Sequence, residues 1–148
     1  MSANIKIVEV SWSKAHKAIS EVRRTVFIEE QKVPKELEWD GIDKDCRHIL
    51  AREFSLEHPH GIPVGTGRLV SDGQIGRMAI LKDYRRLGIG RRILQELIRL
   101  AISDGHRQVF LHAQLSAVEF YQRAGFESTG DTFMDAGIPH IKMKLNLQ

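Results

Sequence analysis

One stretch constrains the fold of this chain more than any other, because a predicted strand, a glycine-containing turn and a predicted helix follow one another there. The strand spans Gln74 to Ile80, the turn contains Gly88 and Gly90, and the helix spans Arg91 to Ser103. The first N–H groups of a helix lack internal partners, and the helix dipole favours negative charge at that end. Glycines also let a ligand approach the backbone closely. This layout therefore favours the binding of an anion.

The composition of the turn narrows the kind of anion. Four arginines flank the turn, at positions 85, 86, 91 and 92, and arginine is suited to bidentate contacts with phosphate. A Walker A pattern is absent, and the third glycine of the dinucleotide fingerprint is missing. The pattern that remains is Arg-x-x-Gly-x-Gly, with Arg85, Gly88 and Gly90 at its defining positions. It predicts a site for a phosphate-bearing cofactor.

This pattern resembles the acyl-CoA-binding motif of the GNAT superfamily of N-acetyltransferases. A second segment, Phe120 to Phe126, resembles the family's tyrosine-bearing helix end with its Gly-Phe turn into the next strand, and the distance between the two motifs suits the family. Three further segments resemble the branch of ElaA-like acetyltransferases: Val22 to Phe27, Glu30 to Pro34 and Gly137 to His140. The resemblance covers nearly the whole chain.

The resemblance implies a fold and a cofactor site. The fold is α/β (α+β), a mixed, mostly antiparallel central sheet that is splayed at the acyl-CoA site and flanked by helices. The acyl donor is acetyl-CoA, with its pyrophosphate on the turn and its pantetheine arm along the strand before it, and one N–H of that strand polarises the thioester carbonyl. The implied cofactor-binding residues are Met78, Ala79, Ile80, Arg85, Arg86, Leu87, Gly88, Ile89, Gly90 and Arg91.

The implied reaction is acyl transfer to a primary amine by direct attack in a ternary complex. Tyr121 is the candidate general acid, which would donate a proton to the departing sulfur. The candidate bases are Glu30, His48 and His112, and a water chain in place of a dedicated base is the alternative. Cys46 and His48 stand at i and i+2, so on a strand they would face the same side, and a Cys–His pair could form an acyl-enzyme instead.

The remaining pattern fits one mixed α/β domain over residues 1–148. Alternation predicts strands at 5–10, 47–54, 63–70, 108–113, 126–134 and 140–147, and helical spacing from Ala15 to Val26 predicts the first helix. Residues 116–123 are predicted to form a short helix. Lys35 to Asp45 is acidic and is expected to be a loop. Its carboxylates would suit a cationic acceptor such as a polyamine, lysine or aminoglycoside.

Composition excludes several other classes. No apolar run approaches the roughly 20 residues that span a bilayer, the N-terminus lacks a signal-peptide core, and Cys46 is the only cysteine, so a cytoplasmic protein is expected. The net charge of +3 is concentrated at the arginine cluster, and bound CoA would offset it.

Expected partners are a small-molecule or peptide amine and a possible homodimer subunit, with no metal, nucleic acid or membrane. A catalytically silent acyl-CoA-binding or sensing module, or a nucleic-acid-binding protein, are the alternatives.

Overall fold

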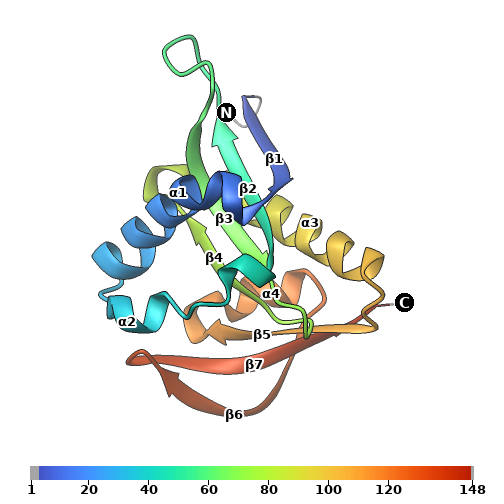
Figure 1. The fold of residues 1–148 in the computed structure, drawn as a ribbon. Coiled ribbons are helices and arrows are strands. Elements are labelled where there is room, and N and C mark those ends of the chain that lie inside the picture. Colours follow the sequence, from blue (N-terminus) through green and yellow to red (C-terminus); the bar gives the residue numbers. More distant parts are fainter. Residues whose placement is uncertain (1–3, 148) are drawn as a thin grey trace.

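Two antiparallel sheets form the framework of the computed structural model, which describes residues 4–147. The first sheet contains β1 (Ile5–Val10), β2 (Arg47–Glu53), β3 (Ile62–Leu69) and β4 (Ile75–Ile80), in that order. The second contains β5 (Gln108–Gln114), β7 (Ile138–Asn146) and β6 (Glu127–Asp135), in that order (Figure 1). The mixed, mostly antiparallel fold predicted from the sequence is confirmed.

The two sheets meet at a single point. Among the described residues, a parallel bridge between Gln74 and Phe110 is the only pairing that joins β4 to β5. Beyond this bridge β4 is an edge strand, so its outer backbone N–H and C=O groups have no ladder partner. The splay expected between the two strands is therefore present.

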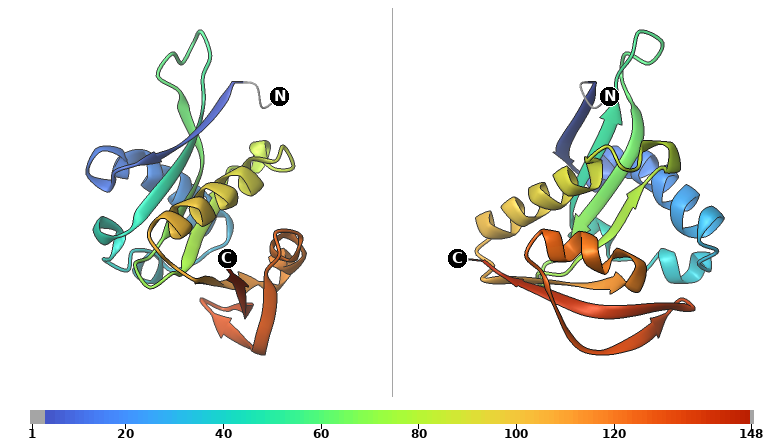
Figure 2. Two further views of the ribbon diagram at one scale, coloured as in Figure 1. Left: turned by 90° about the vertical axis from the view of Figure 1, so that its right-hand side faces the viewer. Right: turned by 180° about the vertical axis from the view of Figure 1, so that it is seen from behind.

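Helices cover both faces of the first sheet. α1 (Trp12–Arg23) packs on one face and continues as a π-helical segment, Arg24–Glu30, whereas α3 (Ile89–Ser103) packs on the other face (Figure 2). α4 (Val118–Arg123) lies against the second sheet. Short 3₁₀ turns occupy Asp43–Asp45, Lys82–Tyr84 and Leu115–Ala117. α3 begins at Ile89, two residues before the predicted Arg91, and Gly88 is its N-cap residue.

The apolar face of α3 forms most of the core between the helix and the first sheet. Ile93, Leu94, Leu97 and Ala101 are buried, as their helical spacing predicts. Ile98, which was also expected on this face, is only partly buried, and Leu100 is buried instead. This packing fixes the start of α3 next to the end of β4. The position of the anion-binding turn therefore follows from the core.

The segment from Lys35 to Asp45 differs from the expected loop. It contains a short helix, α2 (Lys35–Glu38), followed by the 3₁₀ turn Asp43–Asp45. Glu38 and Asp43 are buried, with 3% and 6% of their surface exposed. The expected loop is thus replaced in part by two short helical elements, and arginines from three other elements reach the buried carboxylates.

The ends of the predicted domain, residues 1–3 and 148, lie outside the described residues. Within residues 4–147, the helices are too short or too polar to cross a membrane.

Candidate functional site

A cavity of about 1070 Å³ opens where β4 and β5 diverge. Its walls come from β4, the turn before α3, the first turns of α3, β5, α4, the π-helical segment, α2 and the β6–β7 turn. Residues from both sheets thus face one space. Tyr121, His112 (one of the predicted bases) and the predicted cofactor-binding residues other than Leu87 and Ile89 line it.

Several backbone N–H groups of the turn before α3 have no carbonyl partner among the described residues. Arg86 and Gly88 both have left-handed backbone conformations, with φ of 65° and 83°. Within residues 4–147, no backbone carbonyl accepts a hydrogen bond from the N–H groups of residues 86–91, and the first such bond of the helix runs from Arg92 N to Gly88 O at 3.1 Å. Successive unpaired N–H groups at a helix start form a concave anion site. The turn therefore fits a pyrophosphate.

The two glycines of this turn have different structural roles. A side chain at Gly88 would meet open space but would have to adopt the left-handed conformation, whereas a Cβ at Gly90 would make an ordinary 3.5 Å contact with Phe120. We expect Gly88→Ala to lower the free energy of unfolding by about 1–2 kcal/mol. We expect Gly90→Ala to be neutral or stabilising by up to about 1 kcal/mol. Urea unfolding of both variants measures this, and equal losses would contradict it.

The side chain of Arg85 forms hydrogen bonds with the protein itself, to Ile80 and Glu30. Its Nε donates to the carbonyl of Ile80 at 2.8 Å, and its two terminal nitrogens donate to the Glu30 carboxylate at 2.7 Å each. These bonds tie the turn to the end of β4 and to the π-helical segment. Arg86 and Arg91 also line the cavity, and neither forms an ion pair with another residue of the described chain. Their charges are therefore available to a phosphate.

A β-bulge interrupts β4 inside the cavity. Thr66 pairs with Ala79 and Arg68 pairs with Gly76, so two residues of β4, Arg77 and Met78, oppose the single residue between Thr66 and Arg68. Arg77 has φ of 50°, a conformation that costs a non-glycine residue on the order of 1–3 kcal/mol. Such strain is typical of functional sites, and a bulge leaves one residue outside the ladder.

Tyr121 enters the cavity from α4. Its ring is held by edge-to-face contacts with Phe120 and Phe126, at centroid distances of 5.0 and 5.9 Å. Its hydroxyl has no hydrogen-bond partner among residues 4–147, but it is also absent from the buried, unsatisfied polar atoms of this region, so it reaches the accessible surface of the cavity. Burial raises the pKa of Tyr121 to about 12. The phenol therefore stays protonated at neutral pH and can act as a proton donor.

Two of the three candidate bases lie outside the large cavity. Glu30 lines a smaller, separate cavity, and its hydrogen bonds from Arg85 lower the pKa of its carboxyl. His48 is 1% exposed, stacks on Trp12 and has its Nε2 at 2.8 Å from the carbonyl of Asp43. Burial lowers the pKa of this imidazole. Neither side chain faces the space that the cofactor segment lines.

His112 lines the cavity from β5. Its ring makes an edge-to-face contact with Phe133 at 5.2 Å. Burial lowers its pKa, as do the charges of Lys142 and His140, whereas Asp135 opposes the shift.

Cys46 and His48 do not form the pair that their spacing allowed. Cys46 lies just before β2, and its thiol donates to the carbonyl of Ile42 at 3.4 Å, while His48 bonds Asp43. Burial raises the pKa of the Cys46 thiol, so the thiolate that an acyl-enzyme requires is disfavoured.

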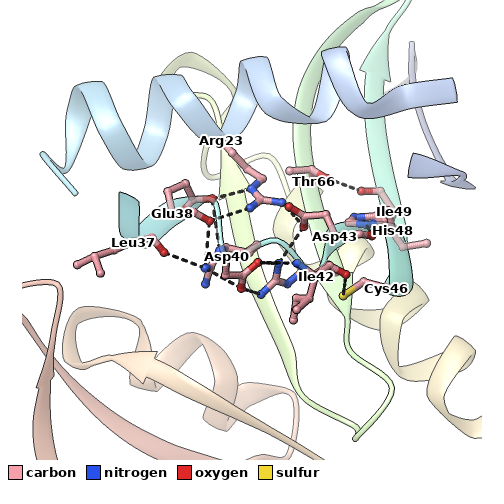
Figure 3. Close-up of polar contacts among 12 residues, drawn as sticks. Arg23, Leu37, Glu38, Asp40, Ile42, Asp43, Cys46, His48, Ile49 and Thr66 are labelled. Carbon is pink, nitrogen blue, oxygen red and sulfur yellow. Dashed lines mark hydrogen bonds and ion pairs between the residues drawn. The ribbon is translucent and has the colours of Figure 1, made fainter. Parts of the chain in front are cut away.

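Three arginines pair with carboxylates of the acidic segment beside the cavity. Figure 3 shows Arg23 bonding Glu38 and Asp43, at 2.6 and 2.7 Å. Arg68 bonds Asp40 and Asp43, and Arg77 bonds Asp40 and the carbonyls of Leu37 and Glu38. Although burial favours the neutral acid, the hydrogen bonds and charge of Arg68 lower the pKa of Asp40 to about 2. Three carboxylates of this segment, Glu38, Asp40 and Asp43, are therefore paired with arginines, whereas Glu36 and Asp45 are exposed.

Several cavity residues were not predicted from the sequence. Gln114 Nε2 donates to Gln31 Oε1 at 2.9 Å and joins β5 to the segment after α1. Arg77 and His140 also line the cavity. The Gly137 to His140 segment had been singled out as a motif, but only the pairing of Gln114 with His140 across β5 and β7 brings the histidine to this site.

Comparisons with known proteins agree with this geometry. Residues 17–147 match the family model of the acetyltransferase (GNAT) domain. The chain is 36% identical over 126 residues to the uncharacterised N-acetyltransferase YjcF of Bacillus subtilis, which covers 82% of this chain and 86% of that relative.

Solved structures share the fold over almost the full length. Escherichia coli ElaA superposes with a TM-score of 0.79 at 26% identity, covering 94% of this chain and 98% of that one. An acyl-CoA N-acyltransferase from Pseudomonas aeruginosa gives a TM-score of 0.79 at 26% identity, covering 95% and 98%.

Proposed function

This chain belongs to the GNAT acetyltransferase family, whose members are acyl-CoA-dependent acyltransferases that act on amines, and from this premise we propose that it transfers an acetyl group from acetyl-CoA to a primary amine of a small molecule or peptide. The observation that carries the proposal is one cavity that joins three features: an anion-binding turn, an unpaired strand edge and an accessible tyrosine hydroxyl. Attack is direct, within a ternary complex.

Acetyl-CoA supplies a thioester, whose carbonyl carbon accepts the amine and whose sulfur leaves. In this proposal the N–H groups of residues 86–91 bind the pyrophosphate, and Arg86 and Arg91 add positive charge. The free edge of β4, from Met78 through Ala79 to Ile80, hydrogen-bonds the pantetheine arm. One N–H of this edge polarises the thioester carbonyl, a contribution typically of about 3 kcal/mol. Tyr121 donates its proton to the sulfur.

The amine loses one proton in this reaction and the sulfur gains one. A new C–N bond replaces the C–S bond, and exchange with water restores the proton of Tyr121. His112 is the one base predicted from the sequence that lines the cavity.

The first test is a thermal melt with and without acetyl-CoA. Ligand at 100 times its dissociation constant adds about 2.7 kcal/mol, which for a chain of this size raises the melting temperature by about 5–10 °C. We expect Arg91→Ala to reduce this rise. Arg99→Ala is the matched control, because Arg99 lies on the same helix, bonds Glu96 and faces away from the cavity. Absence of a rise in the wild type would overturn the cofactor assignment.

A second measurement separates an enzyme from a silent acyl-CoA-binding module. Thiol release from acetyl-CoA is followed with a panel of primary amines of different charge. Amine-dependent release supports the transferase, whereas stabilisation by acetyl-CoA without release from any amine supports the module.

A further inference from the structure

We propose that His140 is the general base that deprotonates the acceptor amine, with its Nε2 as the proton-accepting atom. The inference rests on the proposed function, because it assigns a role within that amine transfer. It starts from the buried histidine at the start of β7, to which neither the sequence motifs nor the comparisons assign a role.

The protonation of the His140 ring follows from a single contact. Nδ1 lies 2.6 Å from the carbonyl oxygen of Ile138. A carbonyl oxygen can only accept a hydrogen bond, so Nδ1 must carry a proton. In the neutral ring the lone pair is therefore on Nε2, the form that a base requires.

The Nε2 atom is accessible, and His140 lines the cavity. His140 is 8% exposed and lines the cavity wall. Within residues 4–147, Nε2 has no hydrogen-bond partner, and it is not one of the buried polar atoms without a partner, which are His48 Nδ1, Arg68 Nε and Arg77 Nε. An unpaired Nε2 that is not counted among these buried atoms must be accessible, so the small exposed surface of His140 includes this atom.

The ring is held in place by packing. It stacks on Phe133 of β6, with centroids 5.9 Å apart and planes 24° from parallel. On β5 it pairs with Gln114, whose side chain reaches Gln31 on the far side of the cavity. A fixed ring keeps its lone pair oriented and avoids the entropy cost of ordering it during the reaction.

His112 is the obvious competitor, and the two rings differ in a testable way. His112 is exposed, and within the described chain neither of its ring nitrogens has a hydrogen-bond partner, so its tautomer is not fixed. The charged groups around this pair are Asp135 at the end of β6, Lys142 on β7, and Glu38 and Arg77 on the opposite wall.

In the proposed step the attacking nitrogen forms the C–N bond and its proton moves to His140 Nε2. The C–S bond breaks and the sulfur takes the proton of Tyr121. His140 then returns its proton to water. Atoms and charges balance without a metal or a redox partner.

The first experiment reads the tautomer directly by two-dimensional ¹H–¹⁵N NMR of the full chain labelled at histidine, near pH 8. We expect His140 in the Nδ1–H form and His140→Gln to remove its signals. A neutral His140 with its proton on Nε2 would overturn the proposal even before any acceptor is known.

The second experiment compares His140→Gln with His112→Gln in the acetyl-CoA melt and in thiol release. We expect both variants to keep the acetyl-CoA-dependent rise in melting temperature. We expect His140→Gln alone to lower kcat by about 10²–10⁴-fold. Imidazole should partly restore His140→Ala.

The outcomes separate this inference from the proposed function. An unchanged kcat in His140→Gln, or an equal loss of kcat in His112→Gln, overturns the role of His140 while the transferase assignment stands. Loss of acetyl-CoA stabilisation in the wild type overturns the transferase assignment itself.

Discussion

Replacement of Tyr121 by phenylalanine is expected to lower kcat by about 10²–10⁴-fold while leaving the acetyl-CoA-dependent rise in melting temperature almost unchanged. The substitution removes only the hydroxyl. The ring contacts with Phe120 and Phe126 remain, and among residues 4–147 the hydroxyl has no hydrogen-bond partner to lose. The folded state should therefore be as stable as the wild type. Turnover should fall but persist, because a thiol with a pKa near 8.5 leaves tolerably as the thiolate.

The pH dependence gives this prediction a second readout. Burial raises the pKa of Tyr121 to about 12, so the phenol stays protonated through the usual assay range. The wild-type rate should then show no loss of the acid form up to about pH 10. A Tyr121→Phe variant with wild-type kcat would remove the general-acid role. A descending limb near pH 10 that disappears in this variant would keep the role but contradict the raised pKa.

The backbone of the cofactor site was more predictable from the sequence than its side-chain contacts. Glycine spacing and helical periodicity act locally, so they indicated the turn, the start of α3 and the strand before it to within two residues. The partner of Arg85 is Glu30, which lies 55 residues away in the sequence. No local pattern reports such a contact, because it depends on how the π-helical segment packs beside β4.

The ion pairs of the acidic segment were likewise not predictable, because their partners are distant in the sequence. Read alone, the run from Glu36 to Asp45 resembles solvated surface, since charged residues are rarely buried. Arg23, Arg68 and Arg77 come from α1, β3 and β4, and only the folded sheet brings them to one place. The pairing of Glu38, Asp40 and Asp43 with these arginines was not predicted, because the sequence shows the charges of both sets but not which of them meet.

Strand pairing determines which of the three histidines on strands reach the cavity. His48, His112 and His140 are all on strands, where alternation leaves either face open. The antiparallel pairing of β5 with β7 places His140 opposite Gln114, whereas β2 is an inner strand of the first sheet and His48 is buried beneath Trp12. Which face looks into the cavity depends on this pairing, so the base could not be selected from sequence spacing alone.

Loss of the buried guanidinium of Arg23 should have the largest effect on stability. Arg23 is 0% exposed and donates to the Glu38 carboxylate, the Asp43 carboxylate and the Glu38 carbonyl. Its guanidinium also lies 5.0 Å from the Trp39 ring centroid. Removing one partner of a buried ion pair leaves an uncompensated charge, which typically costs 3–5 kcal/mol. We expect Arg23→Met to lower the free energy of unfolding by about that amount.

The matched control for Arg23→Met is Arg47→Met, because the two arginines differ chiefly in burial. Arg47 also pairs with two carboxylates, Glu9 and Asp104, but its side chain is 37% exposed. Exposed pairs contribute little, so we expect Arg47→Met to cost no more than about 1 kcal/mol. The double variant Arg23→Met/Glu38→Leu should recover part of the larger loss, because it removes a buried charge on each side.

Urea unfolding of these variants at neutral pH measures the three free energies. Equal losses for Arg23→Met and Arg47→Met would contradict the prediction, because burial would then have no influence. The contacts of Arg23 with Glu38 hold α2 beside the cavity, which Leu37 and Glu38 line. Arg23 variants that still fold should therefore show a raised KM for the acceptor. Their affinity for acetyl-CoA should change little, since the turn before α3 does not depend on Arg23. A parallel loss of acetyl-CoA affinity would mean that the charge cluster supports the whole site rather than its acceptor wall.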